Sequence, residues 1–483
     1  MINIIKQKYN NSPVQLRAAL WFLICSFLQK GISTITTPIF TRLLSTEEYG
    51  QYNVFNSWLG IISIFLTLNL FYGVYTQGLI KFSDERNIFS SSLLGLSTTL
   101  ILIGTVIYLL FHNFWNNLFS LTTVQMLAML IMIWTSAAFN FWACEQRVIY
   151  SYRKLVIISL FVSFLKPIVG IIFVVFSEDK VTARILGLVL VELIGYSGLY
   201  IVQMRKGKVF FSNKYWKYAL TYNLPLIPHY LSQTVLNNAD RIMIRDMVGE
   251  SEAGIYSLAY SISLIMTLLN TALMQTLSPW IYQKIKDKKI HDISSMAYMS
   301  LILIAAVNIL LILCAPEVIA IFAPKSYYEA IWVIPPVAMS VYFMYSYDLF
   351  AKFAFYYEKT KVVMIASVVG AILNIVLNYI CIKKYGYIAA GYTTLVCYVV
   401  YAVCHYVFMN YICINYAKSE KPYDLSIILV ITLIFVISGF AFLLTYNYPI
   451  IRYSLIGLSL IMAIIFKNNI VKLFKILLKV KDK

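Results

Sequence analysis

Hydrophobic segments follow one another along this chain with only short polar links between them. Each has about 20 to 25 residues, which lets an α-helix cross a bilayer core of about 30 Å. In lipid a backbone must satisfy its own hydrogen bonds, so such segments are expected to be helical. Composition agrees, because 60% of the 483 residues are hydrophobic and 12% are charged, about half the charge of a soluble protein. We therefore predict an all-α, polytopic membrane protein.

We count fourteen such segments, which we take as about 14 transmembrane helices. They lie near 18–40, 50–78, 88–111, 122–144, 155–176, 185–204, 219–243, 253–281, 295–322, 331–357, 362–382, 387–413, 425–446 and 449–466. The first is too long for the core of a signal peptide and has no small-residue cleavage site, so we expect it to be retained.

A short signature occurs twice, near the start of a segment in each half. It reads E-x-G-x-Y at 48–52 and again at 252–256, which lie 204 positions apart. The same offset carries Gly187 onto Gly391. A constant offset over this distance predicts a duplication without insertions. Repeated halves that face each other are usual in transporters with a central cavity.

The chain has a net charge of +18, and its basic residues concentrate in particular loops. With the N-terminus inside, roughly two-thirds of the lysines and arginines fall in the inner loops and the C-terminal tail, which is the positive-inside pattern. Arg205, Lys206 and Lys208 in one inner loop and Lys284 and Lys286 in another are examples. The pattern places both termini in the cytoplasm, and an even number of spans agrees. It also predicts attraction to anionic lipids rather than binding of nucleic acid.

The links between segments leave little room for an enzyme. The longest is too short to fold into a domain, and the outer ones carry few acidic groups. No P-loop, nucleophile elbow or zinc pattern occurs. The seven cysteines and four histidines are scattered, without pairing or metal-ligand spacing. We expect no catalytic residue, metal or cofactor, and a membrane polymerase or transferase is the less favoured alternative.

Seven ionisable side chains lie inside the predicted spans, where each costs a few kcal/mol or more unless it is solvated or paired. The four cations are Lys30, Lys166, Arg241 and Lys352, and the three anions are Glu192, Asp240 and Asp348. If they converge, they form a wet cavity with a cationic bias that suits a phosphate or pyrophosphate.

Structural alternatives exist for several of these charges. Asp348 and Lys352 are four apart on one helix face and could neutralise each other. Glu192 has no partner in its own helix and could be a protonated, neutral carboxyl. Arg241 could reach the outer interface. Lys30 lies midway along its span, where the amine reaches the surface least easily, so we expect it to face the cavity.

The seventh segment is polar and interrupted. Pro225 and Pro228 predict a bend or a broken helix. Asn223, Gln233 and Asn237 would line a polar stripe below the charged pair that follows. Transporters place substrate contacts or a moving gate in such spans, and the alternative is a kinked helix held by hydrogen bonds within the bundle. Both roles are also open to two asparagines of the eleventh segment, at 374 and 378.

Three stretches resemble the bacterial polysaccharide transporters, the O-antigen repeat-unit flippases. The first, at 37–52, reads TPIFTRLLSTEEYGQY. The second combines LPLIPH at 224–229, NADR at 238–241 and GIY at 254–256. The third, at 385–391, reads YGYIAAG. These stretches occur in the right order over both halves and are specific for the family, but they do not identify the sugar.

The resemblance implies a fold shared with multidrug exporters and with the peptidoglycan lipid flippase. Spans 1–6 and 7–12 would form two six-helix lobes around a central cavity, with two peripheral C-terminal helices. The substrate would be an undecaprenyl-pyrophosphate-linked oligosaccharide, moved across the bacterial inner membrane without covalent chemistry. A proton or sodium ion would couple the transport. A polysaccharide polymerase and a chain-length regulator would be partners, and a drug or small-cation exporter of the same fold is the alternative function.

In this scheme the seven intramembrane charges divide into two groups. Pyrophosphate would be attracted by Lys30, Lys166, Arg241 and Lys352. Cation coupling, or resetting of the empty carrier, would fall to Asp240, Asp348 and Glu192. The expected organisation is an N-lobe at 1–204, a cytoplasmic linker at 205–217, a C-lobe at 218–414, spans 13 and 14 at 415–466, and a basic cytoplasmic tail at 467–483.

Overall fold

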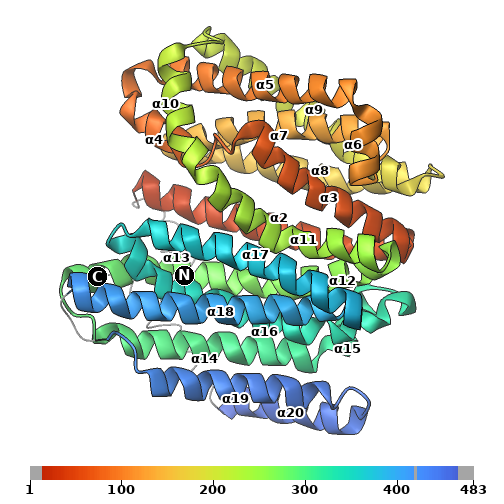
Figure 1. Ribbon diagram of the computed structural model, residues 1–483, viewed down its shortest axis with the longest axis vertical. Coiled ribbons are helices and arrows are strands. Elements are labelled where there is room, and N and C mark those ends of the chain that lie inside the picture. Colours follow the sequence, from red (N-terminus) through yellow and green to blue (C-terminus); the bar gives the residue numbers. More distant parts are fainter. Residues whose placement is uncertain (1–12, 418–420, 466–483) are drawn as a thin grey trace, which may run out of the picture. The chain divides into compact units, whose positions relative to one another are not determined.

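The computed structural model describes residues 13–417 and 421–465, and the tail predicted at 467–483 lies outside them. Across the described residues the chain is helical and contains no strand, which confirms the predicted all-α class (Figure 1). The contacts between its residues divide the chain into two compact units, Met1–Asn238 and Ala239–Lys483. We call these unit 1 and unit 2.

Unit 1 is built around a central helix. Its elements are α2 (Val14–Leu43), α3 (Thr46–Thr67), α4 (Val74–Lys81), η1 (Ser83–Glu85), α5 (Arg86–Leu110), α6 (His112–Phe119), α7 (Thr123–Val148), α8 (Tyr152–Val175), α9 (Lys180–Gly207), α10 (Asn213–Asn223), η2 (Leu224–Leu226) and the first half of α11 (Ile227–Met247). Helix α7 packs against α3, α4, α5, α8 and α9, and α2 packs against α8. The core of the unit therefore lies along α7.

Local sequence explains where several of these helices begin. At α3, Ser45 Oγ accepts from the Glu48 amide at 3.1 Å and Glu48 Oε2 accepts from the Ser45 amide at 2.8 Å. This capping box satisfies two donors that the first helical turn leaves free. Thr122 and Gln125 form the same motif at α7. The glutamate of the first E-x-G-x-Y signature thus has a structural use.

Unit 2 is also built around one long, largely buried helix. Its elements are the second half of α11, α12 (Glu250–Ser263), η3 (Leu264–Met266), α13 (Thr267–Lys286), α14 (Asp292–Leu313), α15 (Ala315–Phe322), η4 (Lys325–Trp332), α16 (Ile334–Tyr356), α17 (Thr360–Tyr385), α18 (Ala389–Ile412), η5 (Cys413–Ala417), α19 (Leu425–Leu443) and α20 (Pro449–Ile465). Helix α16 packs against α12, α13, α14, α17, α18 and α19.

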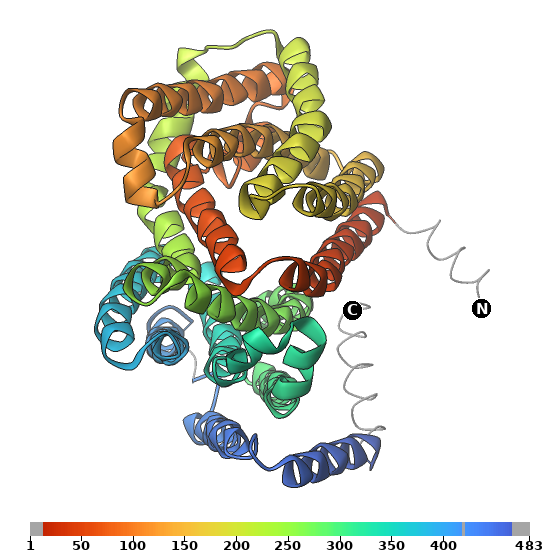
Figure 2. The ribbon, with the colours of Figure 1, turned by 90° about the vertical axis from the view of Figure 1, so that its right-hand side faces the viewer.

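The last two helices of unit 2, α19 and α20, both pack against α14, and α19 also packs against α16 (Figures 1 and 2). Tyr446 donates from its hydroxyl to the Ile312 carbonyl at 2.7 Å. Arg452 on α20 forms an ion pair with Glu317 on α15. These bonds fix the C-terminal hairpin at its turn.

All fourteen predicted segments fall on helices. Among the described residues, ten helices are long and apolar enough to cross a membrane, or eleven if η4 and α16, bent by 49°, form one span. The remaining predicted spans correspond to α3, α11 and α20. Helices α3 and α11 carry several polar residues, and α20 has 17 described residues. The protein is therefore a multi-pass membrane protein.

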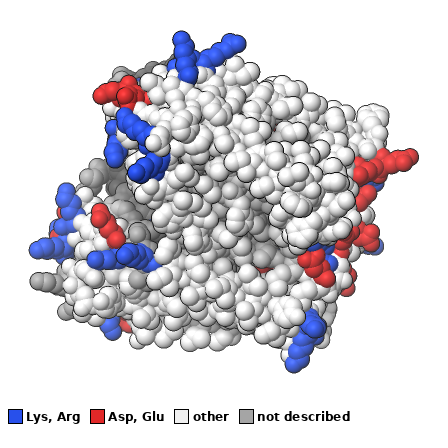
Figure 3. All heavy atoms as spheres, turned by 45° about the horizontal axis from the view of Figure 1, so that its top comes forward, with Lys and Arg blue, Asp and Glu red and all other residues white. Residues whose placement is uncertain are grey.

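The distribution of charged side chains also fits a membrane protein. On the face shown in Figure 3 they gather in separate groups and leave a broad uncharged surface between them. Large apolar side chains such as Ile434 and Ile437 on α19 are exposed. An apolar surface of this kind suits contact with lipid tails.

Candidate functional site

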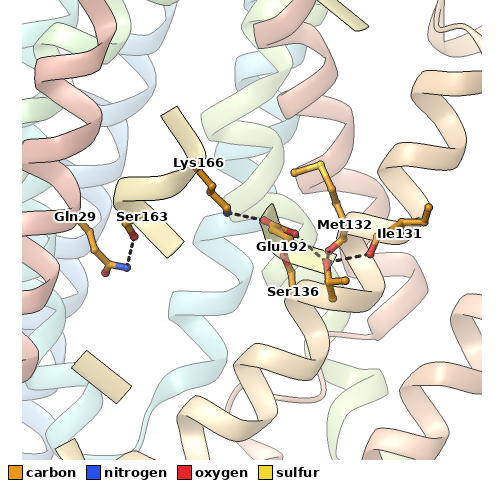
Figure 4. A network of polar contacts seen from close by, with 8 residues as sticks. Gln29, Ile131, Met132, Ser136, Ser163, Lys166 and Glu192 are labelled. Carbon is orange, nitrogen blue, oxygen red and sulfur yellow. Dashed lines mark hydrogen bonds and ion pairs between the residues drawn. The ribbon is translucent and has the colours of Figure 1, made fainter. Parts of the chain in front are cut away.

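Lys166 on α8 and Glu192 on α9 form an ion pair inside unit 1 (Figure 4). The Lys166 Nζ lies 2.5 Å from the Glu192 Oε1. The Glu192 side chain is 3% exposed, whereas that of Lys166 is 28% exposed. Glu192 therefore has a cationic partner, which its own helix does not supply. Removing one member of a buried pair costs about 3–5 kcal/mol, because the other charge is left uncompensated.

The second oxygen of Glu192 is held by hydroxyl groups of α7. Thr135 Oγ1 donates to Oε2 at 2.9 Å and Ser136 Oγ donates to the same atom at 3.2 Å. Figure 4 shows Ser136 on the side of Glu192 away from Lys166. The two carboxylate oxygens are thus bound differently, one by a cation and one by neutral donors.

Lys166 points away from an exposed apolar stripe on its helix. Phe164 and Ile168 belong to an exposed apolar stripe on α8. Lys166 is two residues from each, or about 200° around an α-helix. On the neighbouring turn, Gln29 Nε2 on α2 donates to Ser163 Oγ at 2.9 Å (Figure 4). A polar seam therefore runs across α2, α8 and α9.

The other three intramembrane cations have different surroundings. Lys30 on α2 is exposed, and within the described residues no ion pair involves it. The Arg241 guanidinium carbon lies 4.7 Å from the centre of the Tyr260 ring. Lys352 Nζ lies 2.6 Å from Asp348 Oδ1 on the same helix, so the i,i+4 pair does form.

Asp240 lies at the centre of a buried polar cluster in unit 2. Its side chain accepts from the Tyr256 hydroxyl at 2.6 Å, from Asn378 Nδ2 at 2.5 Å and from Thr394 Oγ1 at 2.9 Å. The residue is 2% exposed. These donors come from α12, α17 and α18, and Asp240 itself belongs to α11, so four helices meet at one carboxylate.

The cluster extends beyond the groups that touch Asp240. Asn378 Nδ2 also donates to Asn374 Oδ1 at 3.2 Å, and Thr393 Oγ1 donates to Asn378 Oδ1. The cluster therefore gathers a carboxylate with amide and hydroxyl oxygens, the atoms that hard cations take as ligands. We refer to Asp240, Tyr256, Asn374, Asn378, Thr393 and Thr394 as the Asp240 cluster.

The repeated signature places a tyrosine at the corresponding point of each unit. Helix α3 begins at residue 46 and α12 at residue 250, so Tyr52 and Tyr256 both lie in the second turn. In unit 1 the Arg184 guanidinium carbon lies 3.5 Å from the centre of the Tyr52 ring and 3.7 Å from the centre of the Phe40 ring. Arg184 is 8% exposed. The tyrosine thus contacts a cation in unit 1 and an anion in unit 2.

The polar residues of the seventh segment are separated by the helix break. Two prolines were expected to bend or break this segment, and η2 confirms that the helix is interrupted. Asn223 Nδ2 donates to the carbonyl of Leu68, a residue with a left-handed φ of 47°. Asn237 Nδ2 donates to the Gln233 carbonyl at 2.9 Å within α11. Asn223 therefore has a clear structural partner.

Sequence reasoning missed several members of these sites. Thr135, Ser136 and Thr394 carried no signal, because single hydroxyl residues are common in apolar helices. Arg184 was not singled out either. Tyr256 was marked by the repeat without a role.

The sequence and the fold match known proteins. The family model for polysaccharide biosynthesis proteins matches residues 16–285, and the MatE model matches residues 225–380. Lsg locus putative protein 1 of Haemophilus influenzae is 23% identical over 376 residues, covering 73% of this chain and 88% of that protein.

Two solved structures share the fold. The lipid II flippase MurJ, in an inward closed conformation, gives a TM-score of 0.72 at 16% identity, with 94% of this chain and 100% of that chain covered. An inward-facing multidrug resistance MATE family transporter of the MOP superfamily gives 0.60 at 14% identity, with 80% and 96% covered. The chain therefore has the fold of these transporters.

Proposed function

The chain belongs to the polysaccharide biosynthesis protein family, and we propose that it is a flippase for lipid-linked oligosaccharides. In this proposal it moves repeat units on undecaprenyl pyrophosphate, such as those of O-antigen, from the cytoplasmic to the periplasmic face of the inner membrane. The observation that carries the proposal is Lys166, an accessible amine inside the apolar part of unit 1. Ammonium groups bind phosphate oxygens strongly where water is scarce.

The hydrocarbon core of the membrane is a barrier to the sugar headgroup. A sugar headgroup does not cross hydrocarbon unaided, because its hydroxyl groups would lose their hydrogen bonds to water. We propose that polar groups of the protein shelter the headgroup while the polyprenyl chain stays in lipid. In transporters built from repeats, one repeat rocks against the other to alternate access, and we assign this motion to units 1 and 2. No covalent bond changes in such a cycle.

The four intramembrane cations are our candidates for attracting the pyrophosphate. Lys30 and Lys166 have the most accessible amines, whereas Lys352 is 13% exposed and bound to Asp348. Arg241 already contacts an aromatic ring. We therefore rank Lys30 and Lys166 first.

Ion coupling is assigned to the Asp240 cluster. Glu192 and Asp348 each contact a lysine, whereas the groups that donate to Asp240 are neutral. A carboxylate held by neutral donors can accept a proton or a sodium ion without first displacing a side-chain cation. We propose that one of these two ions enters here and drives the cycle.

The charge pattern supports a proposal for the orientation of the chain in the membrane. We propose that both termini lie in the cytoplasm, because the lysines and arginines concentrate in the segments that this orientation puts inside. A polysaccharide polymerase and a chain-length regulator would then act on the product at the periplasmic face. Anionic lipids would surround the basic inner loops.

The proposal is tested in a deletion strain by following the lipid-linked repeat unit together with the surface polysaccharide. We expect surface polymer to be lost and repeat units to remain on the cytoplasmic side, with rescue by the intact gene. Lys30→Glu should fail to rescue, because it reverses a charge in the path. Lys289→Glu, an exposed loop residue, is the matched control and should rescue. Repeat units that still reach the periplasmic face would contradict the proposal.

A second candidate is an exporter of drugs or small cations. The MatE match over residues 225–380 favours it, because that region contains Asp240. The same deletion strain separates the two functions. Unchanged surface polysaccharide with altered drug sensitivity would identify the exporter.

A further inference from the structure

The Lys166–Glu192 pair is unequally accessible. The lysine side chain is 28% exposed and the glutamate side chain 3%. A ligand that reaches this point of unit 1 therefore meets the lysine side chain before the buried carboxylate. Its negative end would have to compete with the Glu192 Oε1 for the Lys166 Nζ.

We propose that Glu192 is the resident anion of an exchange site. A pyrophosphate oxygen of the lipid-linked substrate replaces the Glu192 carboxylate at Lys166, and the carboxylate returns when the pyrophosphate leaves. This inference rests on the flippase proposed above and defines how one of its cationic residues works.

The α7 hydroxyls make this exchange feasible. Thr135 and Ser136 bind the oxygen of Glu192 that faces away from Lys166. When the lysine is taken by substrate, the carboxylate keeps both of these hydrogen bonds. A buried anion that retains its donors is far less unfavourable than one that loses every partner. Thr135 and Ser136 are thus positioning residues for the displaced state.

Charge favours substrate in this competition, but only moderately. Pyrophosphate carries more negative charge than one carboxylate and presents several oxygens. The resident carboxylate weakens substrate binding, because it must be displaced first. It also speeds release, because it is ready to take the lysine back, and affinity differences between related complexes lie mostly in the rate of dissociation.

The other lysine–carboxylate pair within the predicted spans has the opposite order of exposure. In Lys352–Asp348 the carboxylate is 34% exposed and the amine 13%. A phosphate approaching that pair would meet the negative group first. Exchange is therefore expected at Lys166 and not at Lys352.

The test uses full-length protein in lipid nanodiscs with undecaprenyl pyrophosphate as the probe and undecaprenol as its uncharged counterpart. Glu192→Gln should tighten binding of the pyrophosphate by roughly tenfold and slow turnover in proteoliposomes. Glu192→Asp, which pulls the carboxylate back from Lys166, should also tighten binding and slow turnover, but by less than Glu192→Gln. Thr135→Val combined with Ser136→Ala should weaken binding.

Glu317→Gln is the matched control, since Glu317 also pairs with a cation but lies on α15. It should leave the affinity unchanged. A purely structural role for Glu192 predicts that Glu192→Gln loses affinity and turnover together with thermal stability, and this result would overturn the exchange. The exchange would also be wrong, with the flippase intact, if wild type prefers the pyrophosphate and Glu192→Gln binds it no more tightly. If wild type binds both probes equally, phosphate recognition itself fails.

Discussion

Asp240, Asp348 and Glu192 lie in predicted membrane spans, and each is stabilised by different neighbours. Glu192 is bound by a lysine of the adjacent helix and two hydroxyls, and Asp348 by a lysine one turn along its own helix. Asp240 is bound by neutral hydroxyl and amide groups. Three carboxyl groups of the same chemical type therefore have three different sets of partners. Only Asp240 receives all of its observed hydrogen bonds from neutral donors.

Replacement of Asp240 should separate its coupling role from its structural role. Asp240→Asn keeps the shape and an acceptor oxygen, so the protein should fold, and transport in proteoliposomes should lose its dependence on the sodium or proton gradient. Asp240→Ala leaves three donors without an acceptor and should lower the free energy of unfolding by about 1–3 kcal/mol. Asp246→Asn, near the exposed end of the same helix, is the control. Ion-dependent transport by Asp240→Asn would refute the assignment.

At the scale of elements, a hydrogen bond connects two helix breaks in unit 1. The predicted span 50–78 is not one helix, because Leu68, Asn69 and Gly73 have positive φ and separate α3 from α4. The second break, η2, separates α10 from α11. Asn223, at the end of α10, donates to the carbonyl of Leu68 in the first break. The residue before the second break thus satisfies a carbonyl of the first, a role usual for polar residues in membrane helix packing.

Removal of the Asn223 side chain should destabilise this junction. Asn223→Ala leaves the partly buried Leu68 carbonyl without its donor, and we expect the free energy of unfolding to fall by about 1–3 kcal/mol. Asn213→Ala, at the exposed start of the same helix, should stay within about 0.5 kcal/mol of wild type. Thermal unfolding in detergent gives both values. Equal melting temperatures for the two variants would show that the Asn223 bond contributes nothing.

At the scale of the whole molecule, the chain consists of two units whose boundary lies within a helix. Contacts divide the chain between Asn238 and Ala239, and both residues belong to α11. Unit 1 contains the Lys166–Glu192 pair, and unit 2 contains the Asp240 cluster. In the proposed flippase, substrate anion and coupling cation would therefore be handled by different units, and α11 would connect them.

The orientation of both units in the membrane is directly testable. In a cysteine-free background, Glu178→Cys should react with an impermeant maleimide added to the periplasmic side of spheroplasts. Asp287→Cys should react only after the membrane is permeabilised, because the positive-inside rule places its basic neighbours in the cytoplasm. Both positions are exposed, so access to the reagent decides the result. Labelling of Asp287→Cys in intact spheroplasts would reverse the predicted topology.

The sequence by itself determined the helical spans, because crossing a bilayer depends on a local run of apolar residues. It also indicated the ion pair between Asp348 and Lys352, since residues four apart share a helix face. The interruption at the two prolines was equally local. The break between α3 and α4 was not visible, because Leu68 and Asn69 look like any other residues of an apolar segment.

Tertiary structure alone decided which polar groups of different helices meet. Lys166 and Glu192 are 26 positions apart, and Asp240 is 138 positions from Asn378 and 154 from Thr394. No local spacing encodes such contacts, because they depend on which helix faces pack together. Lys166, Glu192 and Asp240 were recognisable from the sequence as charges that are costly in lipid. Their partners follow only from the packing of α7, α8 and α9 in one unit and of α11, α12, α17 and α18 in the other.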